Sequence, residues 1–379
     1  MSRWQRRSGA LQAAAAVVAA AVAAVVVVGA APGEAHAESE DLMRTTDALQ
    51  RWTHSSGATA YLVEKHDFGY VSFTIQTRSG ALWDPTHAPG LAHLTSELML
   101  RGAGDRDRTT IAEALEVLGT ELDVGVGKTV IAFEGDALSR NLEAVMAIVG
   151  DILQRPQLTQ DELDRLKREH RSVIIQSRDD DRRLVRRFFN RYLYGSHPYG
   201  LPSDGTLAGV DAITLKDIRR FYAAHMKASN LIVGFAGDVS RKQADVLLDQ
   251  MVGQLPEGRP LLPQSTAPVK PTGRQVLLVD KPDRTQNQIV LGHFAPTSDH
   301  PDHYALDVVN TVYGGTFTAR LNHEIREKRG LSYGAYSRLE ASQTTGTFVQ
   351  WTYPAAEDGM KTIRLLLRLF GELRSSPLT

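Results

Sequence analysis

Three residues within the segment Gly90–Gly102 have types and spacing that bear on hydrolytic chemistry: His93, Ser96 and Glu97. In a His-x-x-Glu-His helix, two imidazoles four residues apart bind zinc from one face, and the glutamate between them activates the metal-bound water. Here Ser96 stands where the general base belongs and Glu97 where the second imidazole belongs. Because a serine has no useful basicity near neutral pH, the spacing of the motif is kept without its chemistry.

Composition excludes several classes of protein. The 379 residues carry 43 basic and 44 acidic side chains and no cysteine. The balanced charge gives no general attraction to nucleic acid, so no nucleic-acid partner is expected. Without cysteine there are no disulfides, thiolate metal sites or cysteine nucleophiles, and any metal would need histidine and carboxylate ligands.

The N-terminus has the pattern of an export signal. Arg3, Arg6 and Arg7 precede a small-apolar run over residues 13–31, and Ala35-His36-Ala37 is a suitable cleavage site. We expect residues 1–37 to be a signal peptide, and the alternative is an uncleaved membrane anchor through residues 13–31, since that length also suits a membrane span. Either way we expect an exported, periplasmic or secreted protein.

Apolar periodicity predicts an α+β fold in which helices back mainly antiparallel sheets. The first series of elements includes a strand at 71–76, a helix from Leu91, an apolar helix at 142–153, a long helix from Thr159 to Arg178 and a strand at 231–237. A proline-rich segment follows. A similar series then begins with a strand at 289–291, and its last predicted element in this sequence is a helix at 359–374. The repetition predicts an N-terminal lobe at 38–255, a linker at 256–272 and a homologous C-terminal lobe at 273–379.

The second lobe is predicted to lack its closing helices and last strand, which would leave apolar faces uncovered. Two explanations stay open: the sequence is a fragment, or a partner completes the lobe. The charged run from Asp179 to Arg187 is interpreted as a solvated surface.

Several motifs together resemble the pitrilysin or insulinase family of zinc peptidases, which includes the mitochondrial processing peptidase subunits. They are the Gly90–Gly102 helix, His197-Pro198-Tyr199-Gly200 with Gly205-Thr206, the strand end Gly234–Asp238, and Arg326–Tyr333. The resemblance covers nearly everything from about Leu49 onward. It implies two lobes, each with a sheet backed by helices, and a peptide substrate enclosed either between lobes or between chains.

The resemblance also implies a third zinc ligand, the second of two glutamates seven residues apart on the later long helix. Glu169 matches the first of these, but Gln176 stands at the ligand position. A neutral amide is a weak ligand, so His93, Ser96, Glu97 and Gln176 together describe a degenerate zinc site with no metal. The alternative keeps a metal on His93, Glu97 and either Glu169 or His170, without the base.

Arg326 and Tyr333 have the spacing of the family's substrate-binding arginine and tyrosine. A guanidinium offers donors to a peptide carbonyl, and a phenol adds another near a developing oxyanion. The resemblance therefore implies a catalytically inactive subunit with no cofactor of its own, which positions peptide for a homologous zinc-bearing partner. The alternatives are a divergent metallopeptidase that uses His93 and Glu97, and a scaffold that binds no peptide.

Overall fold

The computed structural model describes residues 49–256, 258, 268–342 and 344–375. By the density of internal contacts the chain divides into two units, residues 1–170 with 203–263 and residues 171–202 with 264–379. The predicted signal segment 1–37 lies outside the described residues, as does most of the predicted linker 256–272. Among the residues described, no helix combines the length and apolar character needed to cross a membrane.

The first unit is built on a six-stranded sheet in the order β1-β2-β8-β3-β7-β6, with β2 and β8 parallel and the other neighbours antiparallel. Its strands are β1 (Leu49–Thr53), β2 (Thr59–Glu64), β3 (Tyr70–Thr77), β6 (Leu122–Val126), β7 (Ile131–Leu138) and β8 (Leu231–Gly237). A small hairpin joins β4 (Gly102–Ala103) to β5 (Arg106–Asp107). Strand β3 alternates buried and partly exposed residues, which confirms the strand expected at 71–76.

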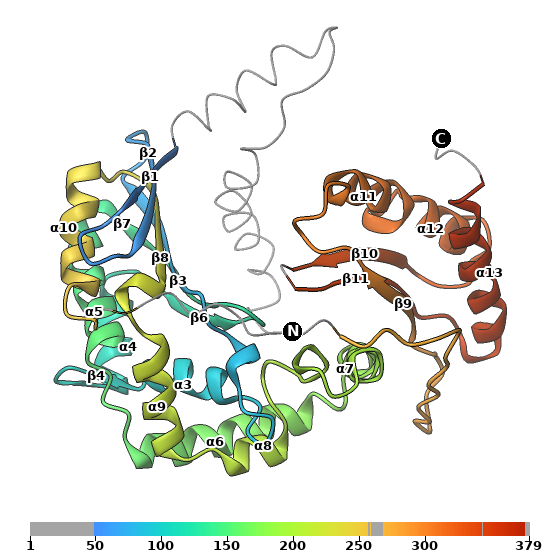
Figure 1. Ribbon diagram of the computed structural model, residues 1–379, viewed down its shortest axis with the longest axis horizontal. Coiled ribbons are helices and arrows are strands. Elements are labelled where there is room, and N and C mark those ends of the chain that lie inside the picture. The colour runs from blue at the N-terminus through green and yellow to red at the C-terminus, as the bar shows by residue number, and fades with distance from the viewer. Residues whose placement is uncertain (1–48, 257, 259–267, 343, 376–379) are drawn as a thin grey trace, which may run out of the picture. The chain divides into compact units, whose positions relative to one another are not determined.

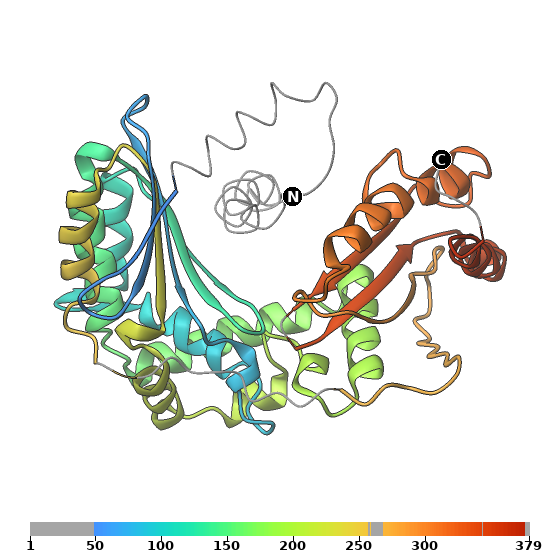
Figure 2. The ribbon, with the colours of Figure 1, turned by 45° about the horizontal axis from the view of Figure 1, so that its top comes forward.

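Helices α5 and α10 lie side by side on one face of this sheet (Figures 1 and 2). The helices are α3 (Leu91–Met99), α4 (Arg108–Val117), α5 (Leu142–Gln154), α6 (Gln160–Gln176), α8 (Leu207–Ala212), α9 (Leu215–His225) and α10 (Arg241–Val252), with α6 continuing into the second unit. Short 3-10 turns lie at Ala81–Trp83, Ser139–Asn141 and Ala228–Asn230. The apolar stripe of α5, which includes Val145, Met146 and Leu153, is fully buried.

The second unit holds a three-stranded antiparallel sheet in the order β10-β11-β9. Its elements are α7 (Asp181–Tyr194), β9 (Ile289–Ala295), α11 (His303–Asn310), α12 (Arg320–Asn322), β10 (Ala335–Ala341), β11 (Gly346–Thr352) and α13 (Gly359–Glu372). Two π-helical turns, Thr311–Gly315 and His323–Glu327, and two 3-10 turns, Pro198–Gly200 and Ala356–Asp358, connect them. Gly314 and Gly315 end the first of these π-helical turns, which continues α11.

The two faces of this small sheet are covered differently. One face packs on an apolar core that includes Tyr313, Ile325, Leu366 and Leu369 from the helical elements of the unit. Helix α7 lies on the opposite face from α11 and α13 (Figure 1), where a Cβ added to Gly292 would come within 2.7 Å of Phe189 Cζ. The order β9-β11-β10 repeats the order β3-β7-β6 of the first unit, in agreement with the predicted duplication.

Residues 171–202, which the predicted boundaries assign to the N-terminal lobe, group with the second unit instead. Long-range contacts explain the difference. Tyr194 Oη lies 2.6 Å from Thr347 Oγ1, Tyr199 Oη lies 2.8 Å from Ser342 Oγ, and Lys281 pairs with Asp181. Such contacts between residues a hundred or more positions apart have no signal in local periodicity.

Candidate functional site

Helix α3 begins at a fixed point because a half-buried carboxylate caps it. Asp84 accepts hydrogen bonds from the backbone N–H of Gly90 at 2.7 Å and of Ala92 at 2.8 Å. Burial raises the pKa of Asp84 to about 6, although these backbone hydrogen bonds oppose the rise. Gly90, with φ +103°, makes the left-handed turn into the helix. The cap therefore sets where His93 lies, within the first turn of α3.

His93 packs against a second histidine, His170 of α6, with ring centroids 4.4 Å apart. Burial lowers the pKa of His93 to about 4, and the charge of a protonated His170 would lower it further. His170 is itself buried, and its Nε2 lies 2.6 Å from the carbonyl oxygen of Asp204. At neutral pH the His93 ring is therefore uncharged and part of a packed imidazole pair.

Ser96 is fully buried, and its hydroxyl donates to the backbone carbonyl of His93 at 3.0 Å. The side chain at the general-base position thus turns back onto its own helix. Glu97, one residue later, is half-buried, and burial raises its pKa against the opposing influence of Arg101 and His170. The carboxyl group of Glu97 therefore lies near existing positive charge.

Glu169 is held by arginines rather than directed at His93. Arg101 Nη2 donates to Glu169 Oε2 at 2.6 Å, and Arg108 Nη1 lies 3.6 Å from Glu169 Oε1. The hydrogen bond from Arg101 holds the pKa of Glu169 below its usual range. Gln176 is exposed at the last position of α6, in the part of the chain that groups with the second unit.

These residues do not fit a hydrolytic zinc centre. Such a centre needs three protein ligands, an open position for water and a base. Throughout the described parts of the chain, no three His, Cys, Asp or Glu side chains are grouped so that they could hold a metal ion. His93 and His170 lie together, but the Glu169 carboxylate is ion-paired with the Arg101 guanidinium. Ser96 stands in place of the base.

The second unit places Arg326 beside Tyr333, the two residues whose spacing matches the family's substrate-binding pair. The guanidinium carbon of Arg326 lies 5.0 Å from the centroid of the Tyr333 ring and 4.4 Å from that of Phe317. Both aromatic side chains are exposed, Tyr333 by 74% and Phe317 by 52%. Gly330, with φ +58°, reverses the chain between the π-helical turn and Tyr333.

The motif spacing does not indicate Phe317, because it is nine residues from Arg326 and shares no helical face with it. Its one signal was an aromatic residue within a polar turn, Thr316-Phe317-Thr318. We name Phe317, Arg326 and Tyr333 the arginine clamp. Its geometry is that of a cation in contact with two aromatic rings, and its role in substrate binding stays a prediction.

The fold and the degenerate motif together define a peptidase-like protein with two α+β units. Residues 61–206 match the family model described as insulinase (peptidase family M16), and residues 212–379 match the model described as the peptidase M16 inactive domain. This chain belongs to the M16 peptidase family.

Relatives in sequence carry the description of uncharacterized zinc proteases. One from Mycobacterium leprae is 31% identical over 68% of this chain and 58% of its own length, and one from Streptomyces coelicolor is 28% identical over 73% and 61%. The chain thus spans about three fifths of the length of these two curated relatives.

Solved structures show the same fold. The peptidase M16 inactive domain from Pseudomonas fluorescens superposes with a TM-score of 0.80 at 28% identity, covering 87% of this chain and 80% of that one. A protease from Helicobacter pylori has a TM-score of 0.76 at 19% identity, covering 84% and 79%, and supports the fold alone.

Proposed function

We propose that this chain is an exported, non-catalytic subunit that binds extended polypeptide and positions it for a homologous, zinc-bearing partner. The observation that carries the proposal is the buried Ser96 hydroxyl, which donates to the His93 carbonyl at the position of the general base. Hydrolysis by the motif requires a base at that position. In this proposal the zinc and the base belong to the partner chain.

The arginine clamp supports peptide binding. An extended peptide presents a carbonyl at every residue, and a guanidinium presents several N–H donors in one plane. The Arg326 guanidinium carbon lies over the rings of both Phe317 and Tyr333, and we infer that these contacts preorganise the side chain. A preorganised donor loses less conformational entropy when peptide binds. Pairing of a peptide with an edge strand such as β6 would add contacts that tolerate many sequences.

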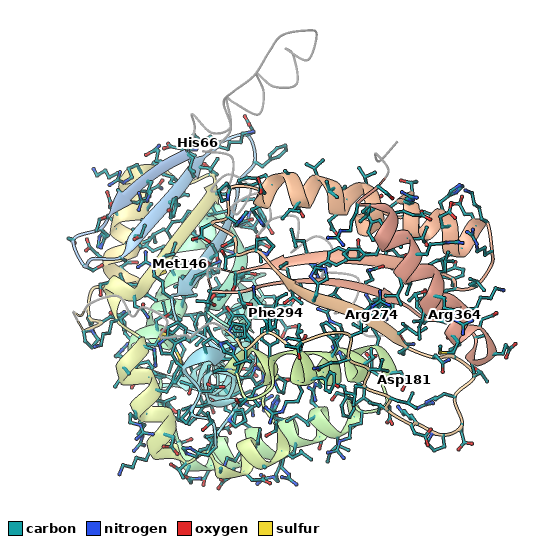
Figure 3. All side chains as sticks on the ribbon, turned by 45° about the vertical axis from the view of Figure 1, so that its right-hand side comes forward. His66, Met146, Asp181, Arg274, Phe294 and Arg364 are labelled. Carbon is teal, nitrogen blue, oxygen red and sulfur yellow. The ribbon has the colours of Figure 1, made fainter. Side chains whose placement is uncertain are left out.

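The test is binding of a fluorescein-labelled peptide of about ten residues, a long strand, with alternating valine and glutamine, measured by fluorescence anisotropy. We expect Arg326→Gln to weaken binding at least about tenfold, because it removes hydrogen bonds from a charged donor. The matched control is Arg364→Gln. Figure 3 shows Arg364 on α13, where it is exposed and has no ion-pair partner among the residues described.

Cleavage assays complete the test. The purified chain with added ZnCl₂ should leave the peptide intact by mass spectrometry, and a homologous chain with an intact His-x-x-Glu-His motif should cleave it faster when this chain is added. Chelator-sensitive cleavage by the chain alone would instead identify a divergent metallopeptidase. Equal binding by wild type and Arg326→Gln would contradict the clamp and favour a scaffold.

A further inference from the structure

The second unit contains a hollow of about 690 Å³ that lies apart from the arginine clamp. Its walls come from α7, α11 and the strands β10 and β11. The volume is within the range of ligand pockets, roughly 300–1,000 Å³. The residues that decide its chemistry are Arg182, Arg338, Tyr336, Trp351 and Asp307.

The floor of the hollow is the free edge of β10. Residues 336–339 all line it, although successive side chains of a strand point to opposite faces of the sheet. A hollow that touches four consecutive residues therefore lies at the edge of the strand. Strand β10 is the terminal strand of its sheet, and no described strand pairs with its outer side. An extended peptide could pair its main chain with this edge.

The walls carry excess positive charge. Arg186 is paired with Glu340, but within the described residues Arg182 and Arg338 have no carboxylate partner. The Arg182 guanidinium carbon lies 4.1 Å from the centroid of Trp351, whose ring stacks with Tyr336 at 5.8 Å. Asp307 is the acidic residue of the lining. A guanidinium that lies over an aromatic ring keeps its positive charge and its N–H donors, which can pair with a carboxylate.

We propose that this hollow binds an acidic stretch of extended polypeptide, whose main chain pairs with β10 and whose carboxylates meet Arg182 and Arg338. The inference rests on the proposed peptide-binding function and specifies the substrate class. It also assigns a use to part of the charged run at 179–187, whose composition alone indicates a solvated surface.

The experiment compares two labelled peptides of about ten residues, one with alternating valine and glutamate and the other with glutamine in place of glutamate. Wild type should bind the glutamate peptide more tightly. Arg182→Gln and Arg338→Gln should each reduce that preference by up to about fivefold, and the double variant should abolish it. Arg364→Gln removes the same charge elsewhere in the unit and should retain the preference. The double variant Arg182→Lys, Arg338→Lys should restore part of the preference for the glutamate peptide. Such a result would show that the glutamine variants lose the preference through loss of charge and not through misfolding.

Three other results would overturn the inference. Equal affinity for both peptides, with Arg326 still required, would refute acidic selectivity and leave the proposed function standing. A preference that Arg364→Gln reduces as much as Arg182→Gln would show only general electrostatics. Binding of neither peptide by a folded wild type would refute both the inference and the proposed function.

Discussion

Replacing His93 with glutamine tests whether this side chain is a neutral packing group rather than a metal ligand. Burial lowers the pKa of His93 to about 4, from the ordinary histidine value of about 6.5. A lowered histidine pKa gives stability that is complete above the unfolded pKa and is lost as the pH falls from 6.5 towards 4. At about pH 5 the loss from this group is about 2 kcal/mol relative to pH 7.5. The glutamine variant should therefore lose about 2 kcal/mol less stability than wild type over this range.

Other groups of the first unit titrate in the same range. Burial also lowers the pKa of His225 to about 4, which adds to the acid loss. The raised pKa of Asp84, about 6, acts in the opposite direction, since its contribution to stability falls as the pH rises from the unfolded value towards 6. Both groups are present in wild type and in His93→Gln, so the difference between the two proteins isolates His93.

The assay is hydrogen exchange of α3 and β8 amides by mass spectrometry, which reports the first unit separately from the second. His87→Gln is the matched control, because His87 is exposed in the same unit, and it should follow the wild-type profile. ZnCl₂ should give no stabilisation that depends on His93, whereas a true ligand would gain stability with metal concentration. An identical pH profile for wild type and His93→Gln would refute the reasoning, as would zinc stabilisation that His93→Gln removes.

Two further changes test the second unit. Phe317→Ala should weaken binding of the valine–glutamine peptide about two- to fivefold with Arg326 and Tyr333 intact, because an exposed cation–π contact contributes about 0.5–1 kcal/mol. Phe317→Trp should retain binding. Unchanged binding in the alanine variant would show that Phe317 is not part of the arginine clamp. Gly314→Ala should destabilise β10 by about 1–3 kcal/mol, measured by hydrogen exchange, because the new Cβ would lie 2.5 Å from Ser337 Oγ. The control is Gly371→Ala in α13, where an added Cβ would meet no atom within 4 Å and should not destabilise the unit.

Local patterns predicted the strands and helices well. The alternating residues of β3, the apolar run of β8 and the buried stripe of α5 are signals within single elements, and the structure has all three where the sequence placed them. The order of motifs along the chain also gave the family correctly. These features depend on neighbours in the sequence, which is why periodicity is sufficient to find them.

The composition of the site depends on distant pairs instead. The family's motif spacing places Glu169 and Gln176 at the two glutamate positions of the long helix. The side chain that packs against His93 is instead that of His170. Adjacent residues on a helix differ by about 100° in direction, so a shift of one position changes which side chain meets α3. Glu169 is ion-paired with Arg101 instead, a residue of the Gly90–Gly102 segment that stands at neither a ligand nor a base position.

The charged run at 179–187 shows the same limit from the side of function. Its composition alone suggests a solvated surface, because like charges in sequence repel and hydrate. The fold then pairs Arg186 with Glu340 and Asp181 with Lys281, partners a hundred or more residues away. These ion pairs neutralise some of the charges in the run but not all of them. Arg182 lies over the ring of Trp351 and has no carboxylate partner among the residues described. What a charged segment can bind is therefore set by the charges that remain after the fold has made its own pairs.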